Sequence, residues 1–82
     1  MGDLAKDVIG VIAEMGGIEP EDIKPDSDLY SLGVDSLSAL EILVALEEKY
    51  EIRIPEKELR NAGTAREIIE IVSKELEKEG KK

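Results

Sequence analysis

Near the start of the chain, apolar side chains recur at steps of three and four residues, which is the spacing of one face of an α-helix. They are Leu4, Val8, Val11, Ile12 and Met15. We therefore expect a helix over about residues 3–15. Two glycines at positions 16 and 17 should end it, because glycine readily adopts the left-handed backbone that terminates helices.

The stretch 18–34 has a different character, with Pro20, Pro25 and a concentration of acidic residues. It predicts a long connection that contains at most one short helical turn. A loop of this length in a small protein needs anchors in the core. Its candidate anchors are the apolar residues Ile18, Ile23, Leu29 and Leu32.

A second helix is expected from Ser36 to about Tyr50, with Asp35 as its N-cap. At 100° per residue, one arc of this helix forms a core stripe of Ala39, Ile42, Leu43, Leu46 and Tyr50. The other arc combines three aliphatic residues with three acids. A solvated surface explains acids but not aliphatics, so this arc favours a docking surface for another protein. We call it the predicted docking face: Leu37, Leu40, Glu41, Val44, Glu47 and Glu48.

The last third of the chain predicts two more helices. A short one should cover about residues 55–61, with Pro55 as its first residue, and a capping box at Thr64–Glu67 should start the last one. The last helix has an apolar face of Ala65, Ile68, Ile69, Val72 and Leu76, and its charged end after Leu76 should fray. The expected fold is thus an all-α four-helix bundle with three longer helices, one short one and a long loop between the first and second.

The length of 82 residues fits a single domain, 1–82, with a core over about 3–77. The sequence contains neither His nor Cys, which excludes hydrolytic triads, thiol nucleophiles and thiolate or imidazole metal ligands. We therefore expect a protein that is not an enzyme and that holds no metal. Any chemistry at a serine must be performed by another protein.

The net charge of −9 is unevenly distributed, since residues 1–48 hold 12 acids and 2 bases. This balance argues against binding to nucleic acid or anionic membranes and favours partner proteins with basic surfaces. The sequence has neither an apolar run of the roughly 18 residues that a membrane span needs nor the pattern of a signal peptide. We expect a cytoplasmic monomer without membrane insertion.

Ser36 is the main candidate for chemistry, because it stands at the expected start of a helix. Backbone N–H groups there have no intrahelical acceptor, and the helix dipole adds partial positive charge. A phosphate ester on Ser36 would be electrostatically favoured at this place. The structural alternative is that Ser36 is only a helix-capping residue.

The motif Asp35-Ser36-Leu37 resembles the attachment site of acyl carrier proteins, in which this serine carries a 4'-phosphopantetheine arm. The segment 45–50, Ala-Leu-Glu-Glu-Lys-Tyr, and the pair Ile54-Pro55 are also similar to that family, over roughly residues 3–77. The resemblance implies a non-catalytic carrier that holds acyl groups as thioesters for fatty-acid, polyketide or related lipid biosynthesis. Its implied partners are a phosphopantetheinyl transferase, with Asp35 helping to position magnesium, and acyl-loading and acyl-processing enzymes with basic docking patches.

Two residues differ from the sequence patterns of particular classes of carrier protein. Ser38 stands where fatty-acid carriers typically have an acid, which favours a dedicated pathway, and Val34 stands where peptidyl carriers usually show a second glycine. The alternatives that remain are a peptidyl, aminoacyl or D-alanyl carrier, which would share the arm but not the cargo, and a carrier-shaped adaptor without an arm.

Overall fold

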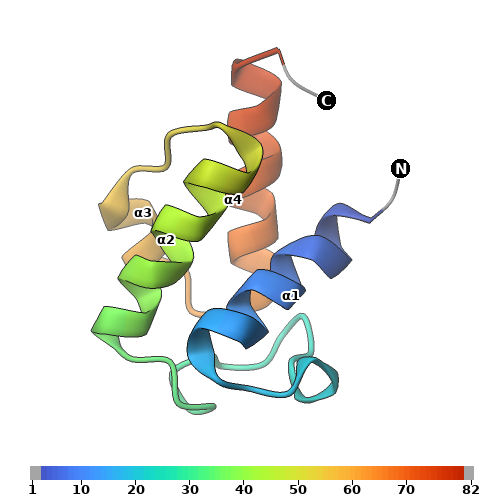
Figure 1. Cartoon of the computed structure of the whole chain (residues 1–82), viewed down its shortest axis with the longest axis vertical. Coiled ribbons are helices and arrows are strands. Elements are labelled where there is room, and N and C mark those ends of the chain that lie inside the picture. Colours follow the sequence, from blue (N-terminus) through green and yellow to red (C-terminus); the bar gives the residue numbers. More distant parts are fainter. Residues whose placement is uncertain (1–2, 81–82) are drawn as a thin grey trace.

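A computed structural model describes residues 3–80, and within this range the chain folds into four α-helices and no strand (Figure 1). They are α1 (Leu4–Gly16), α2 (Ser36–Tyr50), α3 (Glu56–Asn61) and α4 (Ala65–Lys78), with one 3₁₀ turn, η1 (Pro20–Asp22), in the loop between α1 and α2. The predicted all-α bundle with three longer helices and one short one is confirmed.

The helix directions determine which residues share an end of the bundle. α1 packs against both α2 and α4, and it runs in the opposite direction to them. The starts of α2 and α4 therefore lie at the same end as the long α1–α2 loop, at the bottom of Figure 1. Ser36, as the first residue of α2, belongs to this loop end.

The core is aliphatic, as expected from a sequence without Phe or Trp. Its largest fully buried side chains are Val8, Ile12, Leu29, Ile42, Leu46 and Val72. The stripe predicted for the second helix is confirmed for its four aliphatic members, while Tyr50 is only partly buried. Burying these residues provides most of the driving force for folding, at about 25 cal/mol for each Å² of apolar surface removed from water.

The α1–α2 loop is anchored in the core and tied to the start of α4. Ile23 and Leu29 are buried, whereas Ile18 and Leu32 pack at the edge of the core; Val34 is a further buried anchor that the sequence analysis missed. Two backbone hydrogen bonds join the loop to the segment that leads into α4: the N–H of Leu29 donates to Gly63 O at 2.9 Å, and the N–H of Arg66 to Pro25 O at 3.0 Å. These contacts fix the approach to α2.

Helix boundaries in the last third differ in detail from the predictions. Pro55 is the extended N-cap of α3 rather than its first residue, because its ψ of 127° is not helical. The capping box at α4 is present in altered form, since the Thr64 hydroxyl accepts the N–H of Glu67 at 3.2 Å but the Glu67 carboxylate accepts the N–H of Gly63 at 2.8 Å. α4 continues through Lys78, and residues 81–82 of the expected frayed end lie outside the described residues.

Candidate functional site

The chain makes a sharp turn immediately before α2, and this turn presents Ser36 at the surface. Gly33 has a φ of 111°, which side-chain-bearing residues rarely adopt. The next residue, Val34, is buried and holds the turn against the core. Asp35 and Ser36 are both exposed, so the serine is accessible from solvent.

Asp35 caps α2, as the sequence predicts. Its carboxylate accepts a hydrogen bond from the N–H of Ser38 at 2.8 Å. This hydrogen bond, aided by the Ser38 hydroxyl, lowers the pKa of the Asp35 carboxyl below its usual value. Because the cap is Asp35 and Ser36 is already the first helical residue, the alternative of Ser36 as the capping residue is wrong.

The start of α2 is suited to a negatively charged group. The first N–H groups of a helix have no intrahelical acceptor, and the helix dipole places partial positive charge at this end. Ser36 thus combines an exposed hydroxyl with a location that stabilises a phosphate linked to it.

Most of the predicted docking face lies at the surface of α2. Leu37, Leu40 and Val44 are 66%, 36% and 50% exposed, so the three aliphatic residues of this face are accessible to a partner. Glu41 and Glu48 are exposed between them. A shallow, mainly apolar groove runs along this surface and also includes Met15, at the end of α1, and Ala45, which the sequence analysis did not assign to the docking face.

Glu47 is placed differently from the other members of the predicted docking face. Its carboxylate accepts the backbone N–H of Ile54 at 2.8 Å, and its side chain is partly buried. It therefore holds the segment after α2 against the helix. The helical wheel could not reveal this role, because the wheel contains no information on where the chain turns back.

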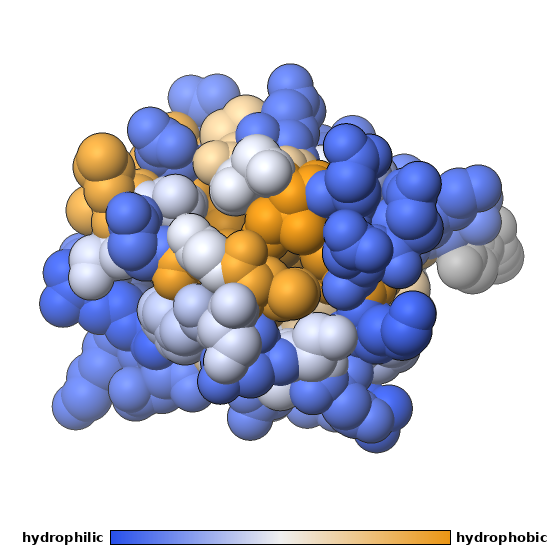
Figure 2. All heavy atoms as spheres, turned by 90° about the horizontal axis from the view of Figure 1, so that it is seen from below, coloured by the Kyte–Doolittle hydropathy of each residue, from blue (hydrophilic) through white to orange (hydrophobic). Residues whose placement is uncertain are grey.

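Two further features lie on the surface at the loop end of the bundle. Viewed from the loop end, hydrophobic residues gather at the centre and hydrophilic residues surround them (Figure 2). Tyr30, in the loop, is 45% exposed and was not identified from the sequence, because no helical periodicity applies there.

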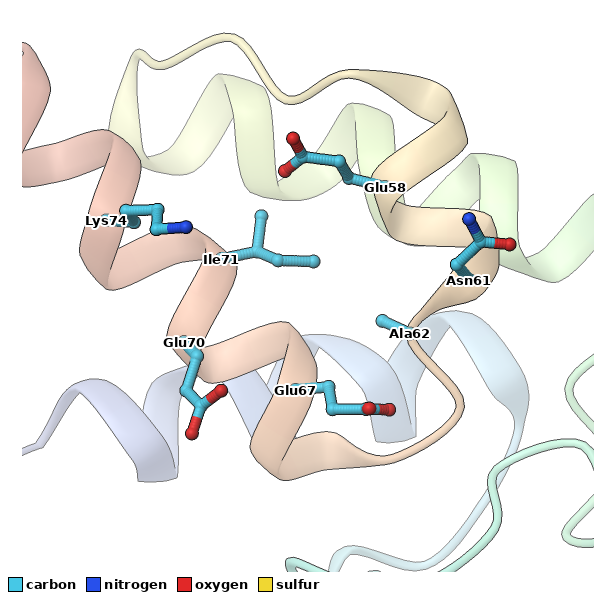
Figure 3. Close-up of a pocket in the computed structure, with 7 residues that line it drawn as sticks. All are labelled: Glu58, Asn61, Ala62, Glu67, Glu70, Ile71 and Lys74. Atoms are coloured by element: carbon cyan, nitrogen blue, oxygen red, sulfur yellow. The ribbon is translucent and has the colours of Figure 1, made fainter.

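A second groove lies between α3 and α4. Glu58, Asn61 and Ala62 lie on its α3 side, and Glu67, Glu70, Ile71 and Lys74 on its α4 side (Figure 3). Throughout the described range 3–80, no group of three or more acidic residues is placed to hold a metal ion. No helix in this range is long and apolar enough to cross a membrane.

A family model described as a phosphopantetheine attachment site matches residues 6–72, which include the whole of α2 and the turn before it. The chain belongs to this family. Phosphopantetheine carrier domains bear a covalently attached 4'-phosphopantetheine group and are in general not catalytic. The exposed serine at the start of α2 fits the attachment of such a group.

This carrier domain is also similar to a region of the non-reducing polyketide synthase dbaI of Emericella nidulans. The two sequences are 33% identical over 75 residues, which is 92% of this chain. The chain spans only 3% of the length of that synthase. The likeness therefore concerns a carrier region and not the rest of the synthase.

Proposed function

We propose that this protein is an acyl carrier whose 4'-phosphopantetheine arm is attached to Ser36. The observation that carries this proposal is the position of Ser36, exposed at the first residue of α2 while Asp35 provides the cap. The hydroxyl is thus available to a partner enzyme. The location within the matched range 6–72 supports the same assignment.

The arm supplies a terminal thiol that holds an acyl group as a thioester. The chain itself contributes the rest of the mechanism: the start of α2 stabilises the charge of the phosphate, and Gly33 and Val34 fix the direction in which Ser36 points. Tethering the acyl group raises its effective concentration at each enzyme to which the carrier docks.

We further propose a polyketide pathway as the setting of this carrier. The support is the 33% identity to a region of a polyketide synthase. Ser38, in place of an acid near the start of α2, agrees with a pathway separate from housekeeping fatty-acid synthesis.

Partner enzymes would dock on α2 through the exposed part of the predicted docking face: Leu37, Leu40, Glu41, Val44 and Glu48. Small apolar contacts surrounded by acids suit weak, rapidly exchanging binding to basic patches. We leave Glu47 out of this proposed surface, because its carboxylate accepts the backbone N–H of Ile54. Asp35, with an exposed and ionised carboxylate beside Ser36, would help to position magnesium in the complex with the transferase.

The attachment is tested by incubation with a phosphopantetheinyl transferase, coenzyme A and magnesium, followed by intact mass measurement. We expect one arm on the wild-type protein and on Ser38→Ala, and none on Ser36→Ala. Ser38→Ala is the matched control, because it removes a hydroxyl two residues away on the same helix. A wild-type protein that stays unmodified with several transferases would favour the adaptor without an arm.

The cargo is tested by loading enzymes of different classes. We expect acyl-transferring enzymes of polyketide pathways to load the arm from acyl-coenzyme A. Loading by adenylating enzymes with amino acids, and not by acyl-transferring enzymes, would instead identify a peptidyl, aminoacyl or D-alanyl carrier.

The docking surface is tested by the double variant Glu41→Lys/Glu48→Lys. It should slow modification by the transferase, mainly through the association rate and more strongly at low salt. The control Glu70→Lys/Glu77→Lys makes the same change of charge at exposed positions of α4. Equal slowing by both variants would mean that only net charge matters and would contradict this docking surface.

A further inference from the structure

Two glycines close α1, and the backbone explains only the second of them. Gly17, the C-cap, has a φ of 68°, in the left-handed region that favours glycine. Gly16 is the last residue of the helix and has no positive φ, so a residue with a side chain could adopt its backbone conformation. Glycine also destabilises a helix relative to alanine. Its presence at position 16 therefore needs another reason.

The space beside Gly16 provides this reason. A Cβ at position 16 would lie 3.2 Å from Ile18 Cδ1 and 3.4 Å from Val34 Cγ2. Ile18 is held there because its N–H donates to Ala13 O at 3.0 Å, which folds the chain back over the end of α1. The Ile18 methyl is the end of a flexible side chain, whereas Val34 is β-branched and buried and can yield only together with its backbone. Gly16 thus makes room for Val34.

Val34 connects this contact to the serine at the start of α2. It stands between Gly33 and the cap Asp35, two residues before Ser36. Its N–H donates to Leu29 O at 3.1 Å, and its side chain is buried. Because both its backbone and its side chain are held, a shift of this side chain is passed along the chain to the serine.

We propose that Gly16 is a positioning residue for the modification of Ser36. By leaving space for Val34, the end of α1 sets the place of the serine hydroxyl. In the transfer, Ser36 Oγ forms a bond to the phosphorus that carries pantetheine in coenzyme A, the bond from this phosphorus to the adenosine bisphosphate breaks, and the serine proton passes to a base of the transferase. Misplacing a reacting atom by about 1 Å can slow such a step by roughly 100-fold. This inference rests on the proposed function, since it takes Ser36 as the site of the arm.

The first test compares two glycines of α1. Gly16→Val adds methyl groups beside Val34, and valine has one strongly preferred rotamer in a helix, so they cannot easily turn away. Gly10→Val is the matched control, because it makes the same change in the same helix where nothing lies within 4 Å of the added Cβ. With the transferase, coenzyme A and magnesium, we expect kcat to fall about tenfold in Gly16→Val and to stay at the wild-type value in Gly10→Val. KM should change in neither, because the docking surface on α2 is kept. Equal kcat in both variants would overturn the proposal.

The second test is a rescue. Val34→Ala removes the methyl groups for which Gly16 leaves space, so it should lower kcat by loosening the turn. In Gly16→Val/Val34→Ala the methyl groups added to α1 refill this space, and we expect a higher kcat than in either single variant. Losses that simply add in the double variant would contradict the proposal. If circular dichroism shows Gly16→Val to be unfolded, Gly16→Ala, which adds one methyl group and favours the helix, should give a smaller fall in kcat with the same rescue.

The third measurement uses the unmodified proteins and is independent of the transferase. The amide signals of Asp35, Ser36 and Ser38 in nuclear magnetic resonance should shift in Gly16→Val, stay in place in Gly10→Val and return toward the wild type in the double variant. Unchanged signals in Gly16→Val would overturn the positioning by Gly16. A wild-type protein that no transferase modifies would instead overturn the attachment at Ser36, while the amide signals still decide whether Gly16 sets the place of the turn.

Discussion

The carboxylate of Asp35 accepts the backbone N–H of Ser38 at 2.8 Å. This contact closes the first turn of α2 around Ser36, so that the serine lies between the cap and the residue that the cap binds. Asp35 therefore has two separable properties at this site. It caps the helix through an oxygen atom, and it carries a negative charge beside the serine hydroxyl.

Asp35→Asn should separate the cap from the charge. Asparagine caps a helix about as well as aspartate, so the melting temperature should stay close to that of the wild type, whereas Asp35→Ala should lower it. Both variants should be modified more slowly by the transferase, since both lack the charge that would help to position magnesium. Thermal melts and modification rates measure the two effects. Normal modification of Asp35→Asn would contradict the role of the charge.

The lowered pKa of Asp35 also predicts a dependence of stability on acid pH. Its ionised form stabilises the folded state above the ordinary pKa of 3.8, and this contribution is lost as the pH falls through the lower pKa of the folded protein. In Asp35→Asn this carboxyl group is absent, so the free energy of unfolding should decrease less as the pH falls. Denaturant unfolding at several values of pH below 5 would measure it, and identical pH profiles for the two proteins would contradict it.

At alkaline pH the relevant group is Tyr50, whose pKa is raised above 10.0 by burial and by the negative charge of Asp7. The unfolded chain releases this proton more readily than the folded protein. The contribution of Tyr50 to the free energy of unfolding should therefore be fully present below pH 10 and decrease as the pH rises beyond it. Tyr50→Phe should show a smaller fall. Unfolding free energies at pH 9 to 11 would test this, and equal falls in the two proteins would exclude Tyr50 as the cause.

Glu47 and Glu48 are neighbours in sequence that should respond differently to replacement by alanine. Glu47→Ala leaves the partly buried N–H of Ile54 without its carboxylate, so the free energy of unfolding should fall by about 1–3 kcal/mol. Glu48→Ala removes only an exposed side chain and should stay within about 0.5 kcal/mol of the wild type. Chemical denaturation measures both. A small effect of Glu47→Ala would mean that water replaces the carboxylate.

The two faces of α2 can be compared through Leu46 and Leu37. Leu46 is fully buried, so Leu46→Ala should lower the free energy of unfolding by about 2–5 kcal/mol. Leu37 is 66% exposed, and Leu37→Ala should change stability by no more than about 0.5 kcal/mol while weakening partner docking. Comparable destabilisation by both variants would contradict the assignment of the two faces.

Local patterns in the sequence were sufficient to predict the three longer helices and the cap of α2. Periodic apolar residues identify the face that must be removed from water, and they placed Val8, Ile12, Leu46 and Val72 correctly in the core or on its face. Asp35 could be predicted because a cap binds a backbone group only three residues ahead. The exposed position of Ser36 follows from the same local geometry.

Contacts between distant segments could be decided only by the tertiary structure. Glu47 looked like a surface acid on the helical wheel, and its bond to Ile54 depends on where the chain turns after Tyr50. Tyr30 showed no pattern at all, because its partner is a carbonyl group 30 residues away. Sequence periodicity records which side of an element is buried, since burial repeats along the element. It does not predict which polar atoms form hydrogen bonds between distant segments, because that depends on how the packed helices bring the two segments together.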